Sequence, residues 1–329
     1  MAEKMIYYSS GKLLITCEYA VIDGACALAL PTKLGQSMTV VDAEKSRLHW
    51  VAKDMDGKIW FENDFDTIDF NPIHQKDNVS KRLQQILINV REQNQDFLAG
   101  SIGALIETQL DFSRNWGLGS SSTLINNIAQ WANVNPFNLQ QKVFGGSGYD
   151  IACAQKSNPI TYQLFKQNPI TTDVSFHPPF HQHLFFIYMN KKQNSRASIR
   201  HHFKGVTDHL IDALNTLTKR FINAKTVSDF QMLMLSHESI VSKLIGIDPV
   251  QETEFSDYEG VVKSLGAWGG DFVLACGPTK SKEYFAAKGF TVCFPYAELI
   301  SSAIKNQEGT SKSLPLHLAL HCIHINLLY

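Results

Sequence analysis

The stretch Asn115 to Leu124 reads NWGLGSSSTL, with two glycines and three consecutive serines directly before an apolar residue. Leu124, Ile125, Ile128 and Trp131 recur at helical spacing behind it, so we expect the serines to stand where a helix begins. A helix start carries unpaired N–H groups and a partial positive charge. Because glycine lacks a Cβ atom, a phosphate chain could approach this backbone closely. A plain capped loop is the alternative that the segment alone leaves open.

The individual residues of this segment support an anion site. Gly117 and Gly119 would permit the close approach, and Ser120, Ser121 and Ser122 would add hydroxyls for helix capping, for phosphate or for Mg²⁺. The spacing matches neither the P-loop motif nor the dinucleotide-binding fingerprint.

The composition is that of a globular chain without a strong overall field. The 329 residues are 44% hydrophobic and 19% charged, which favours two domains, and the formal net charge is −1. We therefore expect no nucleic-acid partner and no membrane partner. The first residues lack the apolar run of a signal peptide, no apolar run reaches the ~18 residues of a membrane span, and the six cysteines are scattered. A cytoplasmic protein with reduced thiols is the prediction.

Outward from the serine segment, the patterns predict an α+β protein. Turns are expected at Gly11 and at Asp23-Gly24, and the polar, proline-containing stretch Gln155–Asp173 is the expected domain junction. Strands are predicted at Lys4–Ser10, Lys12–Ile22, Ala25–Pro31, Lys58–Asn63, Ala99–Leu110, His183–Asn190 and Phe272–Gly277. Helices are predicted at Asp77–Asn94, behind an Asp77 or Asn78 cap, and at Val206–Ala224 and Val227–Gly246.

Four segments together resemble a known family. SSGKLLITCEYAVIDGACALALP (Ser9–Pro31), GLGSSST (Gly117–Thr123) and SLGAWGGDFVLACG (Ser264–Gly277) resemble, in this order, the three signature segments of the GHMP kinases. GGSGYDIACA (Gly145–Ala154) resembles the aspartate-bearing stretch of that family. Within the family the segments look most like mevalonate kinase and phosphomevalonate kinase, and Asp271 in GGD tilts the resemblance toward phosphomevalonate kinase.

The resemblance implies a two-domain fold, with an N-terminal α/β nucleotide-binding domain over residues 1–170 and a ferredoxin-like C-terminal domain over 171–329. The active site would lie in the cleft between them, with ATP and Mg²⁺ as cofactors. Lys12 and Asp150 match the family's catalytic lysine and aspartate, and Ser121 is the candidate Mg²⁺ ligand. The residues that match the nucleotide site are Gly117, Leu118, Gly119, Ser120, Ser121, Ser122, Gly266, Gly269 and Gly270.

The chemistry that these residue types support is phosphoryl transfer to an alcohol. An ionised Asp150 could accept the hydroxyl proton, and Lys12 within ~4–6 Å would lower the pKa of that carboxyl. Taken alone, Lys12 could equally be a solvated lysine and Asp150 an Asx-turn residue. Glu18 could be a carboxylate that contacts substrate or the buried partner of a basic group.

A basic segment follows the predicted strand His183–Asn190. Lys191, Lys192 and Arg196 lie around an expected helix start at Asn194 or Ser195, where they could bind a phosphate or carboxylate on the substrate. A solvated basic surface is the equally weighted alternative.

Among the departures from the resemblance, two bear on metal and nucleotide binding. Gln140 or Gln141 stands where many relatives have a Mg²⁺-binding glutamate, and an amide oxygen is a weaker ligand for a hard cation. Trp268 replaces a small residue, and its bulk could narrow the nucleotide pocket or stack on a ligand.

The leading hypothesis is an ATP-dependent kinase that phosphorylates phosphomevalonate or mevalonate, a small-molecule alcohol, on the route to isoprenoids. A catalytically weak or inactive relative that binds nucleotide or metabolite is the alternative, with a diphosphomevalonate decarboxylase-like enzyme as a third reading. The sequence leaves the oligomeric state open, a homodimer included.

Overall fold

A computed structural model describes residues 4–43, 46–99, 103–191, 205–266, 268 and 270–301 of the chain. Lys192, Arg196 and Gly269, which the sequence singles out as site residues, lie outside the described residues, as does the helix start expected at Asn194 or Ser195.

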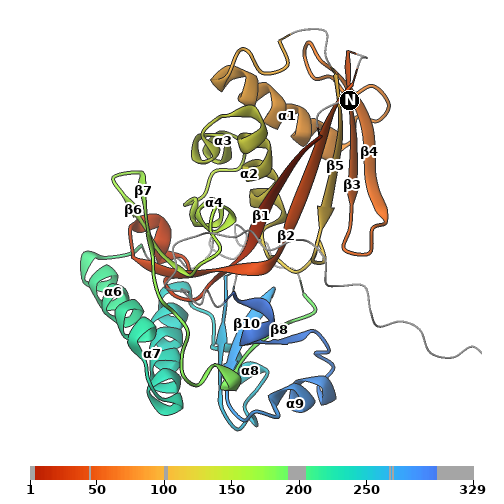
Figure 1. The fold of residues 1–329 in the computed structure, drawn as a ribbon. Coiled ribbons are helices and arrows are strands. Elements are labelled where there is room, and N and C mark those ends of the chain that lie inside the picture. Colours follow the sequence, from red (N-terminus) through yellow and green to blue (C-terminus); the bar gives the residue numbers. More distant parts are fainter. Residues whose placement is uncertain are drawn as a thin grey trace, which may run out of the picture.

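The first half of the chain builds a seven-stranded sheet (Figure 1). The strands are β1 (Lys4–Leu14), β2 (Ala27–Ala43), β3 (Arg47–Lys53), β4 (Ile59–Asp66), β5 (Gly103–Leu110), β6 (Ile160–Phe165) and β7 (Asn168–Asp173). They follow the order β4-β3-β5-β2-β6-β7, and β1 pairs with β2 beside this path. β3 and β5 are parallel, and the other pairs are antiparallel.

Helices cover one side of this sheet (Figure 1). They are α1 (Asn78–Gln93), α2 (Ser120–Ala132), α3 (Pro136–Val143) and α4 (Tyr149–Ala154), and a short 3₁₀ helix, η1, spans Ala20–Asp23. The predicted cap of the first helix is confirmed, because the Asp77 side chain accepts a hydrogen bond from the Ser80 N–H. The predicted helix after the serines is confirmed as α2, whose Ile125 and Ile128 are buried against the sheet.

The second half builds a four-stranded antiparallel sheet of β8 (Leu184–Tyr188), β9 (Val261–Ser264), β10 (Phe272–Cys276) and β11 (Cys293–Pro295). The other elements are η2 (His181–His183), α6 (Asp208–Asn223), α7 (Val227–Ile245), α8 (Val250–Thr253), α9 (Ser281–Ala287) and α10 (Tyr296–Leu299). The strand order β11-β8-β10-β9, with helices after β8 and β10, is the βαββαβ arrangement of ferredoxin-like sheets. The two sheets with their helices confirm the predicted α+β class.

One hydrophobic core joins the two sheets. Leu13 of β1 and Leu118 of the glycine–serine segment share a buried cluster with Phe186 of β8 and Leu274 of β10. Apolar side chains from both halves therefore fix β1 and the serine turn relative to the C-terminal sheet.

Three predictions about the chain path are wrong. β1 runs through Gly11 without a turn, with a register shift between Ser10 and Lys12. The strand predicted over Lys12–Ile22 ends at Leu14, because the chain then bends into η1. The stretch Gln155–Asp173 contains the β6–β7 hairpin of the first sheet. The predicted boundary at residue 170 thus falls inside β7, and the change from one sheet to the other comes between residues 173 and 184.

Across the described ranges, no helix combines the length and apolar character that crossing a membrane requires.

Candidate active site

The glycine–serine segment forms the start of α2. Gly119, at φ 93°, occupies the N-cap position, and no side chain caps the helix. The Ser122 hydroxyl is buried and donates to the Gly119 carbonyl at 2.8 Å. Ser120 and Ser121 line the adjoining pocket. Of the uses predicted for the three serines, capping is therefore wrong, and Ser120 and Ser121 are the two placed to contact a ligand.

Lys12 lies directly against this turn. Its backbone N–H donates to the Leu118 carbonyl at 3.0 Å. A Cβ atom on Gly119 would lie 3.1 Å from Lys12 Cγ and 2.7 Å from Ser122 Oγ. A Cβ on Gly11 would lie 3.0 Å from the Leu118 carbonyl. The glycines are needed because the strand and the turn touch here, and this contact brings two segments about 107 residues apart in the sequence to one point.

Asp150 stands in the first turn of α4, near Lys12. Its Oδ1 accepts a hydrogen bond from the Ile151 N–H at 3.1 Å, and the Lys12 ammonium lies 5.5 Å from the centre of the Tyr149 ring. Burial lowers the pKa of Lys12, but Tyr149, Asp150 and Asp271 outweigh it, so this pKa lies above its ordinary value. The structure thus brings the predicted lysine and aspartate into one charged cluster.

The pKa of Asp150 is shifted in the direction opposite to the one that the sequence predicts. Burial raises this pKa, and Lys12 and the Ile151 N–H lower it without cancelling the effect. The lysine acts in the predicted direction, but the cost of removing the carboxylate from water is larger.

Gln140 is the glutamine that reaches this cluster. It is buried, and its Nε2 lies 3.3 Å from the Gly145 carbonyl and 3.5 Å from Asp150 Oδ2. Its Oε1 has no hydrogen-bond partner within the described part of the chain. Gln141 is exposed.

The third glycine-rich segment reaches the serine turn through Asp271. A Cβ atom on Gly117 would lie 2.5 Å from Asp271 Oδ2, so the carboxylate occupies the space beside that glycine. Asp271 has φ 53°, and its backbone bonds Lys191 and Met189 at 2.8 Å each. The pocket beside Ser121 has neither Gly266 nor Gly270 among its lining residues.

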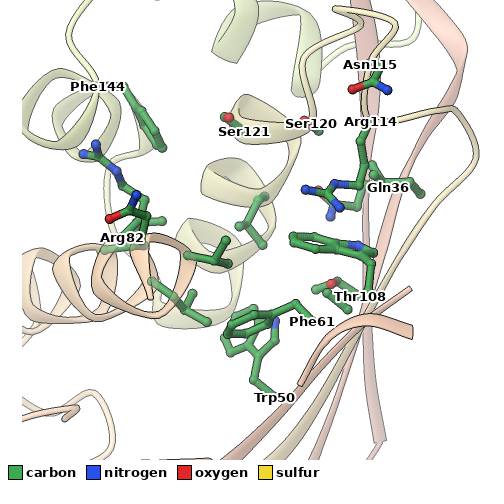
Figure 2. A pocket seen from close by; sticks show the side chains of 18 residues that line it. Gln36, Trp50, Phe61, Arg82, Thr108, Arg114, Asn115, Ser120, Ser121 and Phe144 are labelled. Atoms are coloured by element: carbon green, nitrogen blue, oxygen red, sulfur yellow. The ribbon is translucent and has the colours of Figure 1, made fainter. Parts of the chain in front are cut away.

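A pocket of about 410 Å³ opens beside Ser120 and Ser121 (Figure 2). Figure 2 shows the two serines at one end and Trp50 and Phe61 at the other. The Arg114 guanidinium carbon lies 3.6 Å from the centre of the Trp60 ring. Such a volume, with aromatic walls and a polar end, suits a flat heterocycle attached to an anionic chain. Sequence reasoning missed Trp50, Trp60 and Arg114, since no motif carries them.

Glu18 takes the second of the roles considered for it, that of a buried partner. It is 1% exposed, and its Oε1 lies 2.5 Å from the Lys263 ammonium. His237 Nε2 lies 3.3 Å from Glu18 Oε2, but this nitrogen accepts a hydrogen bond from the Cys17 N–H. Because burial also lowers the pKa of His237, the imidazole is neutral and makes no ion pair.

The two remaining predicted ligand contacts lie elsewhere. Lys191 is exposed, with its ammonium 3.6 Å from Glu254 Oε1. Trp268 is 1% exposed and packs with Leu244 of α7, and its backbone N–H donates to the Tyr19 hydroxyl. The tryptophan therefore does not narrow the pocket beside Ser121.

The fold resembles solved kinase structures. The mevalonate kinase of Methanococcus jannaschii matches at a TM-score of 0.66 and 16% identity, over 89% of this chain and 96% of that one. The phosphomevalonate kinase of Streptococcus pneumoniae, solved with phosphomevalonate and AMPPNP, matches at 0.65 and 15%, over 86% and 95%. The galactokinase of Lactococcus lactis, solved with galactose, matches at 0.62 and 13%, over 86% and 88%. No protein-family model and no curated protein sequence matches the chain.

These likenesses define the class of fold. The chain has the two-sheet α/β fold that mevalonate kinase, phosphomevalonate kinase and galactokinase share, which is the GHMP kinase fold. The four sequence segments that resemble this family meet in space at Lys12, Gly119, Asp150 and Asp271.

Proposed function

We propose that this protein is an ATP-dependent small-molecule kinase that transfers the γ-phosphoryl group of ATP to phosphomevalonate or mevalonate. The observation that carries the proposal is the contact of the Lys12 side chain with Gly119, in a cluster that includes Asp150. A phosphate chain on the turn would end beside a lysine and a base. The choice of acceptor rests on the segments that resemble mevalonate and phosphomevalonate kinases and on the two solved neighbours of those names.

The pocket beside Ser120 and Ser121 would hold the rest of the nucleotide. The purine would stack among Trp50, Trp60 and Phe61, and the phosphates would run to the backbone N–H groups at the start of α2. Gly117 and Gly119 add no side chain of their own to the turn, where Asp271, Lys12 and Ser122 already lie close. The N–H groups at the start of α2 would therefore point at phosphate oxygens.

Asp150 and Lys12 would perform the proton and charge work of the transfer. With mevalonate, Asp150 would accept the proton of the acceptor hydroxyl as its oxygen attacks the γ-phosphorus and the bond to the β-phosphate breaks. With phosphomevalonate, the attacking oxygen belongs to the acceptor phosphate, and Asp150 would accept the proton that this phosphate carries as a monoanion. Lys12 then stabilises the negative charge on the transferring group. Since burial raises the pKa of Asp150, this carboxylate is a stronger base than a solvated aspartate.

The site offers oxygen ligands that fit Mg²⁺. The Ser121 hydroxyl faces the pocket, and Gln140 presents a buried amide oxygen without a partner among the described residues. These neutral oxygens, with waters and phosphates, suit the octahedral shell that this cation prefers. When bound, the ion would neutralise charge on the phosphates.

The decisive experiment is an ADP-release assay with a panel of acceptors. The purified full-length chain is given ATP and Mg²⁺ with mevalonate, phosphomevalonate, galactose or homoserine. We expect acceptor-dependent ADP formation with one of the first two. Asp150→Asn should retain AMPPNP binding and lose at least about 10²-fold in turnover, since general-base contributions are of that size. Asp173→Asn, on the exposed β6–β7 hairpin, is the matched control that should keep wild-type turnover.

A nucleotide-binding protein without transferase activity is the second candidate. Gln140 favours it, because an amide donor near Asp150 Oδ2 replaces the anionic ligand that the resemblance leads one to expect. This candidate predicts AMPPNP binding without acceptor-dependent ADP from any member of the panel. A decarboxylase-like activity would instead show as CO₂ release from diphosphomevalonate.

A further inference from the structure

The Lys12 side chain has contacts at two points along its length. Its stem runs along Gly119, since a Cβ atom on that glycine would lie 3.1 Å from Lys12 Cγ and 3.6 Å from Lys12 Cε. Its ammonium lies 5.5 Å from the centre of the Tyr149 ring, within the ~6 Å at which an aromatic face attracts a cation. A lysine stem is flexible, so the contact with the glycine would not by itself fix the position of the ammonium. The ring therefore acts on the end of the side chain that would meet a phosphate.

Tyr149 is itself held in place by its helix and by the core. It stands directly before Asp150 in the first turn of α4, whose N-cap is Gly148. Its side chain is half-buried and packs against the cluster of buried residues that includes Leu14 of β1 and Ala152 of α4. The core therefore supports the ring that contacts the ammonium.

The contact joins a charged ammonium to a neutral phenol. Burial raises the pKa of Tyr149, and the charge of Lys12 and its hydrogen bond to the hydroxyl lower it by less, so the hydroxyl keeps its proton at neutral pH. Burial lowers the pKa of Lys12, but its surroundings, Tyr149 first among them, raise it above its ordinary value. The lysine therefore keeps its charge, and the attraction between cation and ring persists at the pH of an assay.

Resting on the proposed function, we propose that Tyr149 is a positioning residue that holds the Lys12 ammonium against the γ-phosphate of the bound nucleotide. The lysine would contact the phosphate, and the tyrosine would act through the lysine. Because Asp150 follows Tyr149 directly, the first turn of α4 would place both the base and the ring that directs the lysine.

The test compares the affinities for AMPPNP and for ADP, measured by titration calorimetry with Mg²⁺, in the wild type and in Tyr149→Leu. We expect the variant to lose about 10-fold for AMPPNP, the size of a partly desolvated contact between a cation and a ring. Its affinity for ADP should stay within about twofold, because ADP lacks the γ-phosphate that Lys12 would contact. Leucine keeps apolar contact with the core, so the variant should fold. Tyr284→Leu is the matched control, since it removes a ring 5.3 Å from the Lys288 ammonium, and both affinities should equal those of the wild type.

A double-mutant cycle with Lys12→Met shows whether the tyrosine acts through the lysine. If it does, Tyr149→Leu should cost no more than about twofold in AMPPNP affinity once Lys12 is methionine, because the effects of coupled residues do not add. Tyr149→Phe keeps the ring and loses the hydroxyl, so its AMPPNP affinity should stay within about threefold of the wild type. Pentafluorophenylalanine at position 149 has nearly the shape of phenylalanine but a reversed ring quadrupole, and it should lose about as much as leucine.

Several outcomes overturn the inference and leave the proposed function standing. An AMPPNP affinity of Tyr149→Leu within twofold of the wild type, or a loss in Tyr149→Phe equal to that in Tyr149→Leu, means that the ring does not hold the lysine. Equal losses for AMPPNP and ADP, or a loss that persists beside Lys12→Met, mean that the tyrosine only shapes the site. If leucine prevents folding, equal affinities of the phenylalanine and pentafluorophenylalanine variants overturn the inference instead. A wild-type chain that binds no AMPPNP refutes the proposed function and the inference together.

Discussion

Replacing Lys263 by methionine tests how the buried charges behind the site hold the fold together. Lys263 is fully buried in β9, and its ammonium contacts Glu18 Oε1 at 2.5 Å and the Ser264 carbonyl at 2.8 Å. Glu18 follows β1, so the pair joins the strand that carries Lys12 to the C-terminal sheet. Removing one partner of a buried pair costs roughly 3–5 kcal/mol, because the other charge stays buried without compensation.

The pH dependence gives this prediction its sign. Burial already raises the pKa of Glu18 above its ordinary 4.5, and Lys263 works against that rise. Without the lysine the folded protein keeps Glu18 protonated, while the unfolded chain releases the proton above 4.5. Above about pH 4.5 the unfolding free energy of the variant then falls by up to about 1.4 kcal/mol for each pH unit. The wild type falls less, because Lys263 keeps the pKa of its Glu18 lower, so the loss caused by the substitution is larger at about pH 8 than at about pH 5. Glu238, whose pKa burial raises to about 8, is largely protonated at neutral pH and changes little.

Urea unfolding of the wild type and Lys263→Met, followed by circular dichroism at both pH values, measures the difference. The double variant Glu18→Gln/Lys263→Met should recover most of the loss at the higher pH. Lys53→Met breaks the surface pair with Glu107, and it should cost no more than about 1 kcal/mol at either pH. A loss for Lys263→Met that is the same at both pH values, or below about 1 kcal/mol at the higher one, would refute the reasoning.

Three further predictions concern the site. Gly119→Ala, with φ 93° and a Cβ 2.7 Å from Ser122 Oγ, should weaken AMPPNP binding by at least about 10-fold in fluorescence titration. Gly57→Ala, also at positive φ but with no atom within 4 Å of its Cβ, should leave the affinity unchanged, and equal effects of the two would contradict the close-approach argument. Trp60→Ala should weaken AMPPNP binding by about 10-fold, since stacking on an aromatic ring is worth roughly 1–3 kcal/mol per base. An unchanged affinity in calorimetry would show that the base does not bind in this pocket. Because burial raises the pKa of Asp150, kcat/KM should fall on the acid side with a midpoint above the ordinary 3.8, and a flat profile down to that pH would rule out Asp150 as the base.

Local patterns identified the elements that carry the site. The spacing of Leu124, Ile125 and Ile128 predicted α2, and Asp77 predicted the start of α1, because helix faces and caps depend on residues a few positions apart. The strand through Gly11 was misread as a turn. Glycine is needed there because a Cβ atom would collide with Thr32 and come close to the Leu118 carbonyl. Both neighbours are distant in the sequence, so no local pattern could predict this requirement.

The electrostatics depended on burial, which the sequence does not show. From the sequence we predicted that Lys12 lowers the pKa of Asp150. In the structure this pKa is raised instead, because the desolvation of the buried carboxylate outweighs the effect of the lysine. Glu18 could be assigned no role from sequence, since its partner Lys263 is 245 residues away.

The sequence by itself determined the α+β class and the position of the serine turn at a helix start, and it singled out Lys12 and Asp150 as candidate site residues, since these signals reside in short motifs. Only the tertiary structure decided that Asp271 abuts Gly117, that aromatic residues of β3 and β4 wall the pocket, and that Gln140 approaches Asp150. The physical reason is that such contacts come from packing two sheets on one core, and packing depends on the whole chain at once.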